Sequence, residues 1–68
     1  MLDKTTDPQE AIKIAIEKER EAQLFYRQYA DLFENEGTRQ MFIFLANEER
    51  KHEEKLQKEL EENYLYEM

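Results

Sequence analysis

The sequence predicts an all-α fold, an antiparallel two-helix hairpin that dimerises into a four-helix bundle. Three observations support this prediction. Apolar residues recur at helical spacing along two long segments. The one proline and the one glycine stand where helices commonly begin and end. A chain of 68 residues without cysteine rarely buries enough apolar surface alone. We therefore expect residues 1–68 to form a single half domain that needs a partner chain.

The first helix is expected over residues 8–35. Asp7 precedes it as an N-cap acceptor, and Pro8 lacks only a backbone N–H that the first turn leaves without a partner. Nothing in the following segment breaks a helix until its predicted end. The loop is expected at residues 36–37, because Gly37 can take the left-handed conformation that ends many helices.

The second helix is expected over residues 38–63, with Thr38 as its cap. It can extend further, into residues 64–66, and the last five residues of the chain are expected to fray. Because the predicted connection is only a few residues long, the two helices should fold back on each other as an antiparallel pair.

Helical periodicity indicates which side chains face the other helix. The stripe of the first helix is centred on residues spaced by seven: Ile12, Glu19, Tyr26 and Phe33. The stripe of the second helix contains Met41, Phe42, Leu45, Glu49, His52, Leu56 and Leu60. Glu19, Glu49 and His52 therefore point into an otherwise apolar interface at similar depth. The other acids, expected on or near the solvated faces, include Glu10, Glu17, Glu21, Glu34, Glu53, Glu54 and Glu61.

Four further apolar residues of the first helix lie outside its stripe: Ile14, Leu24, Phe25 and Leu32. A hairpin buries one stripe per helix, so these residues need another cover. We expect a second copy of the chain to supply it, as a homodimer or a higher oligomer.

Composition and charge exclude several classes of protein. The chain has 17 Asp and Glu against 10 Lys and Arg, and this acidic balance argues against nucleic-acid binding. No apolar run approaches the roughly 18 residues of a membrane span, and residues 1–7 lack the features of a signal peptide. The absence of cysteine excludes disulfides, thiolate zinc sites and iron–sulfur clusters. We expect a cytoplasmic protein.

The predicted position of Glu19, Glu49 and His52 favours a metal site. Buried carboxylates and imidazoles are costly unless they are paired or bind a metal. The spacing Glu49-x-x-His52 places both side chains on one helical face, one turn apart, where they can hold one ion or bridge two. The alternative is a half-buried His52 that is hydrogen-bonded to Glu48 or Glu49, with no metal present.

Two motifs resemble a known family. The first helix carries Glu-x-x-Ala-x-x-x-Tyr, beginning at Glu19, and the second carries Phe-x-x-Leu-Ala-x-x-Glu-x-x-His-x-x-x-Leu, beginning at Phe42. Over about residues 10–60 the chain resembles rubrerythrin-type ferritin-like proteins. The resemblance implies a carboxylate ligand at Glu19, a bridging carboxylate at Glu49 and a nitrogen ligand at His52. It makes Gln23 and Tyr26 candidate neighbours of the ligands, and Glu48 a residue that orients His52 or acts as an auxiliary ligand.

The chain differs from that family in carrying one ligand set where a full ferritin-like bundle carries two. Three side chains hold one metal poorly and two metals not at all. A dimer, as in the encapsulated ferritins that the chain resembles, implies two iron ions per dimer, with manganese or zinc as alternatives. The implied activity is that of an oxidoreductase with no catalytic residues beyond the ligands. It oxidises Fe(II) with O₂ or peroxide, and peroxide reduction is the second choice.

Other interpretations remain open at this point. The chain can be a helical dimerisation or interaction module without metal, in which the aromatic residues serve packing only. It can also be a fragment, or one half of a complex with a different chain. An encapsulating shell is a further candidate partner, but residues 63–68 show no recognisable encapsulation tag.

Overall fold

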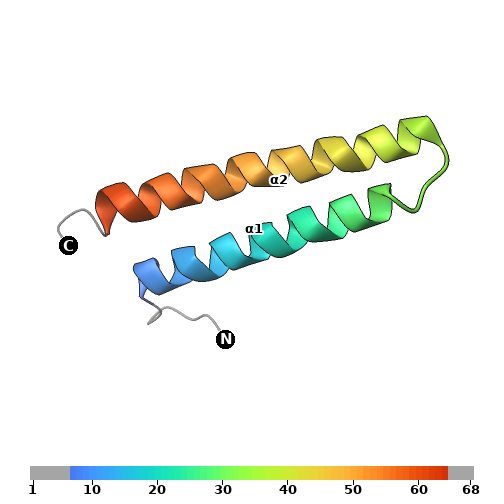
Figure 1. The fold of residues 1–68 in the computed structure, drawn as a ribbon. Coiled ribbons are helices and arrows are strands. Elements are labelled where there is room, and N and C mark those ends of the chain that lie inside the picture. The colour runs from blue at the N-terminus through green and yellow to red at the C-terminus, as the bar shows by residue number, and fades with distance from the viewer. Residues whose placement is uncertain (1–6, 65–68) are drawn as a thin grey trace.

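The computed structural model describes residues 7–64 and shows two antiparallel α-helices side by side, joined by a loop at one end (Figure 1). Helix α1 spans Pro8–Ala30 and helix α2 spans Glu36–Asn63. The described residues contain no strand. The prediction of an all-helical hairpin is therefore confirmed. Neither helix has the length and apolarity that crossing a membrane requires.

Helix α1 begins where the Asp7–Pro8 pattern predicts. The Asp7 side chain accepts a hydrogen bond of 3.2 Å from the backbone N–H of Gln9, and the Asp7 carbonyl accepts one of 2.9 Å from the N–H of Ala11. Glu10 adds a carboxylate to the first turn, where the helix dipole favours negative charge. The start of α1 is thus fixed by local sequence alone.

The end of α1 and the position of the loop differ from the prediction of a helix over 8–35 and a loop at 36–37. The helix ends at Ala30. The N–H groups of Leu32 and Phe33 then bond to carbonyls three residues back, at 3.0 and 3.3 Å, which is the tighter geometry common at helix ends. The Phe33 ring packs against that of Phe42, with centroids 5.1 Å apart. The connection therefore occupies residues 31–35.

Helix α2 starts at Glu36, two residues before the predicted 38–63, because Asn35 and not Thr38 is its cap. The Asn35 side chain accepts a hydrogen bond of 2.9 Å from the backbone N–H of Thr38, and asparagine caps a helix better than threonine. Gly37 lies in the first turn, and no described residue has a positive φ, so the left-handed loop glycine was a wrong prediction.

The far end of α2 lies at Asn63, where the second helix was expected to end. The Tyr64 N–H still bonds to the Leu60 carbonyl at 3.0 Å. The expectations about further helix and fraying after Tyr64, the signal peptide and the encapsulation tag fall wholly or largely on residues 1–6 and 65–68. These two stretches lie outside the described residues.

The contact between the helices is small. Its buried apolar residues within 7–64 are Ile16, Ala30, Ala46 and Leu60. Ala46 has no exposed surface at all, and so small a side chain lets the two helices approach closely. The predicted stripe of α2 did not include it, although it lies on the same side as Phe42 and Leu60.

Replacing Ala46 with leucine should destabilise the hairpin by about 1–3 kcal/mol, because a filled contact has no space for three more carbon atoms. Chemical denaturation of the metal-free protein measures the change in the free energy of unfolding. Gln28→Leu, at an exposed position of α1, is the matched control and should change that free energy little. Equal effects of the two substitutions would contradict this account of the contact.

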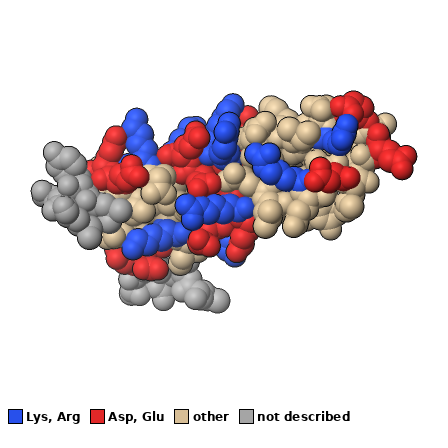
Figure 2. Space-filling model, viewed as in Figure 1, with Lys and Arg blue, Asp and Glu red and all other residues tan. Residues whose placement is uncertain are grey.

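Many large apolar side chains remain exposed in the half of the hairpin nearer the loop. They are Leu24, Phe25, Tyr29, Leu32, Met41 and Phe44. Figure 2 shows the same division, with charged residues concentrated over the half nearer the chain ends and mostly other residues near the loop. The radius of gyration is 15.1 Å, against about 11 Å for a compact chain of this length. The hairpin is a single layer that leaves one side of its apolar residues in solvent.

Candidate metal centre

Glu19, from the middle of α1, meets Glu49 and His52 of α2. One ligand atom from each residue can be chosen so that all three lie within 4.8 Å of one another. His52 Nδ1 lies 3.0 Å from Glu49 Oε1 and 3.3 Å from Glu19 Oε2. Glu19, Glu49 and His52, which the sequence predicts at a similar depth in the interface between the helices, therefore lie close together.

Helix geometry explains this meeting. Glu49 and His52 are separated by three residues, which puts them one turn apart on one face of α2. Glu19 reaches them from α1 because the antiparallel arrangement sets the middle of one helix beside the middle of the other (Figure 1). The ligand candidates thus sit on two rigid elements and not on the loop.

Burial differs among the three residues. The Glu19 and Glu49 side chains are each 23% exposed, whereas the His52 side chain is 52% exposed. The Oε2 atom of Glu19 is buried and lacks an aligned hydrogen-bond donor among the described residues, and a buried acceptor in that condition is costly. A bound cation would satisfy this oxygen. The donor set of two carboxylates and one imidazole also suits a divalent metal.

The charges of the group are coupled. A hydrogen bond with Glu49, followed by burial, raises the pKa of Glu19, and the same hydrogen bond lowers the pKa of Glu49. A hydrogen bond to Glu49 is also the main reason that the pKa of His52 is raised. Contacts within the group are therefore the main cause of the raised pKa values of Glu19 and His52 and of the lowered pKa of Glu49.

The other predicted site residues lie around this group in different roles. Gln23 donates hydrogen bonds to Glu53 and to the backbone carbonyl of Glu19. The Tyr26 ring packs edge-on against Phe42, with centroids 5.9 Å apart. Glu48 forms an ion pair of 3.2 Å with Lys51, so its carboxylate is engaged with a lysine and not with His52 Nδ1.

An aromatic cluster adjoins the group on the side of the loop. Its members, whose neighbouring ring centroids are 4.6 to 6.4 Å apart, are Phe25, Tyr26, Tyr29, Phe33 and Phe42. Rings at these separations pack favourably in tilted or edge-on pairs.

Glu53 is the residue that the sequence interpretation missed. It was assigned to the solvated faces, yet its side chain is only 21% exposed and contacts α1. Its carboxylate accepts hydrogen bonds of 2.8 Å from Arg20 Nε and 2.6 Å from Gln23 Nε2. The signal was present in the helical spacing, because Glu53 lies four residues after Glu49 and thus on nearly the same face.

A comparison with protein families gives one match, to a family described as Rubrerythrin, over residues 3–67. Comparisons with the curated proteins and with the solved structures give no match. The family match covers both helices and every residue of the candidate centre.

Proposed function

This chain belongs to the rubrerythrin family, and we propose that it is a di-iron carboxylate protein whose metal site forms between two subunits. The observation that carries the proposal is the meeting of Glu19, Glu49 and His52 within 4.8 Å. Carboxylate oxygens with an imidazole nitrogen suit iron and manganese, and zinc binds the same donors. Iron is the metal we propose, with manganese or zinc as alternatives.

One hairpin supplies half of the ligands that such a site needs. Di-iron sites in four-helix bundles use one Glu from each of two helices and a Glu-x-x-His pair from each of the other two. This chain offers Glu19 as the single Glu and Glu49 with His52 as the pair. Two copies related by a two-fold axis together supply four carboxylates and two imidazoles, the set for two iron ions per dimer.

The exposed side of the hairpin supports a second copy as the partner. We define the open face as the side away from Arg20 and Glu53, marked by Phe25, Tyr29, Met41 and His52. At 100° per residue, Tyr29 lies opposite Arg20 on α1, and Met41 lies within about 20° of His52 on α2. All four residues are exposed. A copy packed on the open face covers these apolar side chains and brings its own ligands to the site.

The activity we propose first is oxidation of Fe(II) by O₂ or peroxide, with peroxide reduction second. A bound metal would supply this redox chemistry, and Glu19, Glu49 and His52 would hold it. Because the 68 residues include no cysteine, peroxide reduction needs an electron donor from outside them. Oxidation of Fe(II) takes its electrons from the substrate itself. The reducing cytoplasm, where Fe(II) is present, is the compartment we propose.

Anaerobic titration with Fe(II) tests the proposal. We expect saturation at about two iron ions per dimer, the number that four carboxylates and two imidazoles hold in this class of site. Exposure to air should then produce the near-ultraviolet absorption of Fe(III) bound to oxygen ligands. Saturation without any change in air would leave a metal protein without the proposed activity, and no binding would contradict the proposal.

The pH dependence of stability should reverse on metal binding. In the metal-free protein the raised pKa of His52 contributes stability that is complete below the ordinary histidine value of about 6.5 and is lost as the pH rises through the raised pKa. The metal-loaded protein requires a neutral imidazole and should lose stability as the pH falls. Thermal unfolding between about pH 5.5 and 8.5, with and without a chelator, measures both slopes. Equal slopes in the two states would contradict the assignment of His52.

A further inference from the structure

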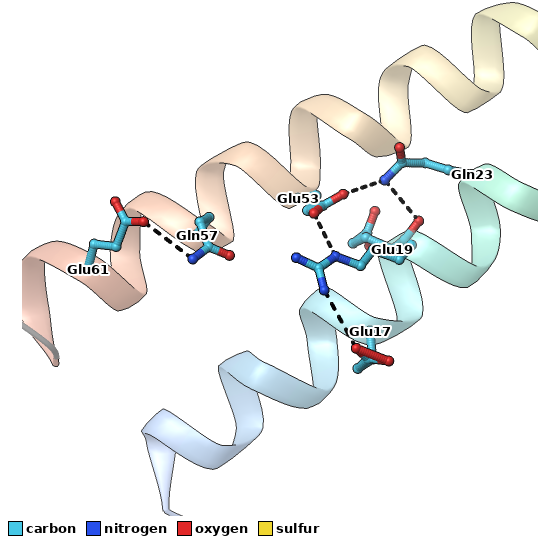
Figure 3. Close-up of polar contacts among 7 residues, drawn as sticks. Glu17, Glu19, Gln23, Glu53, Gln57 and Glu61 are labelled. Carbon is cyan, nitrogen blue, oxygen red and sulfur yellow. Dashed lines mark hydrogen bonds and ion pairs between the residues drawn. The ribbon is translucent and has the colours of Figure 1, made fainter.

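Glu53 joins the two helices on the face opposite the open face. Its carboxylate accepts hydrogen bonds from Arg20 Nε and Gln23 Nε2, both from α1, and Figure 3 shows the bond from Gln23. Within residues 7–64, both hydrogen bonds that side-chain N–H groups of α1 donate to α2 end on this carboxylate. Hydrogen bonds from Arg20 and then from Gln23 hold the pKa of Glu53 below its usual value. We call these three residues the Glu53 bridge.

The Glu53 bridge lies at the same position along the two helix axes as the candidate ligands. Arg20 follows Glu19 directly in the sequence, and Glu53 follows His52. Successive helical residues differ by only about 1.5 Å along the axis and by about 100° around it. The bridge and the ligands thus lie at the same position along the helix axes, but on different sides of the contact between the helices. Gln23 links them further, because its Nε2 also donates to the Glu19 carbonyl at 3.3 Å.

The apolar part of the contact constrains the relative position of the two helices along their axes less sharply than the Glu53 bridge does. Apolar burial is non-directional, and two of the four buried apolar residues, Ala30 and Ala46, have small side chains. A metal site tolerates ligand displacements of only about 0.2 Å, whereas a slip of one helical turn moves a ligand by about 5.4 Å. Hydrogen bonds to a single carboxylate are directional and lose their geometry after a much smaller slip.

We propose that Glu53 is a positioning residue. By holding Arg20 and Gln23, it fixes the position of Glu19 along the helix axis relative to Glu49 and His52. This inference rests on the proposed metal site and adds to it a residue that does not touch the metal. It separates two neighbouring acids of α2 by role: Glu49 binds the ion, and Glu53 sets the distance at which Glu19 can reach the same ion.

Co(II) binding to the full chain tests this inference, because Co(II) absorption reports the geometry of its ligands. We compare Glu53→Gln with Glu61→Gln, the same change on the same helix at a residue whose contact, with Gln57, lies within α2. Glu53→Gln should weaken Co(II) binding about 10- to 100-fold, the usual effect of losing a residue that orients a ligand. It should also shift the visible absorption bands, and Glu61→Gln should do neither.

A merely structural role would give a different result. It would lower the thermal midpoint of the metal-free protein without changing the absorption bands of bound Co(II), and that outcome overturns the inference. Arg20→Gln removes one of the two donors and should shift the bands in the same direction by a smaller amount. If Glu53→Gln does not fold, Arg20→Gln is the variant to compare with Glu61→Gln. If the unaltered chain binds no Co(II), the proposed function fails and this inference fails with it.

Discussion

Replacing Glu19 and His52 together with alanine is expected to abolish iron binding. Each chain then keeps Glu49 as its only ligand from the group of three, so a dimer keeps two carboxylates and no imidazole. Two isolated carboxylates cannot surround a pair of ions. Iron that remains after anaerobic loading and desalting should fall from about two ions per dimer to fewer than about 0.2, as measured by elemental analysis.

The matched control is Glu21→Ala/Glu61→Ala, which removes one exposed carboxylate from each of the same helices. Its iron content should equal that of the unaltered chain, and far-ultraviolet circular dichroism should show helix in all three proteins. Unchanged iron binding in the Glu19→Ala/His52→Ala variant would show that the ligands lie elsewhere. If chelators leave the thermal midpoint unchanged and Glu19→Leu raises it, the chain is instead a helical interaction module without metal.

Introducing a charge on the open face should separate the subunits and remove the metal without touching a ligand. Met41 is 55% exposed in the hairpin and shares its face of α2 with His52. A two-fold interface contains each substitution twice, so Met41→Glu buries two carboxylates that have no partner. We expect the dissociation constant of the dimer to rise on the order of 10²- to 10³-fold, measured by sedimentation, with a parallel loss of bound iron.

Leu24 provides the control for that substitution. It is 59% exposed, but it lies about 40° from Arg20 around α1 and hence away from the open face. The proposed dimer therefore leaves Leu24 uncovered, unlike the expectation from the sequence. Leu24→Glu makes a comparable apolar-to-acidic change and should leave both the dimer and its iron content in place. If Leu24→Glu dissociates the dimer and Met41→Glu does not, the second copy packs on the opposite side of the hairpin.

The sequence predicts well those features that one segment decides by itself. The start of α1 depends on Asp7 and Pro8, whose effects act within a single turn. The family resemblance depends on motifs within each helix and is confirmed by the match over residues 3–67. The meeting of Glu19 with Glu49 and His52 could be anticipated because two regular helices joined by a short loop bring their middles together.

The loop was mispredicted because two signals competed there. Gly37 and Thr38 indicate a stop followed by a cap, but Asn35 is the better cap and starts α2 earlier. Gly37 is then taken into the first turn with an ordinary backbone conformation. Local propensity alone does not decide between adjacent caps. The packing of Phe33 against Phe42 is a contact between the connection and α2 that no single segment reveals.

The environments of Glu53 and His52 depend on contacts beyond a single helix. Glu53 looks like a solvated acid until Arg20 and Gln23 are placed opposite it. His52 was expected at the core, yet the hairpin leaves half of its side chain exposed. The helical period indicates the face on which a residue lies, but a second layer of helices is needed before that face becomes an interior. The sequence therefore predicts the face on which His52 lies but not the exposure of its side chain in the hairpin.

The mass of the purified protein in solution, measured together with its metal content, tests the central claim most directly. We expect a particle of twice 8.4 kDa, or an even multiple of the chain, that carries about one iron ion per chain after loading with Fe(II). A monomer of 8.4 kDa that binds iron, or a stable dimer that takes up none, would contradict a metal site shared between two subunits.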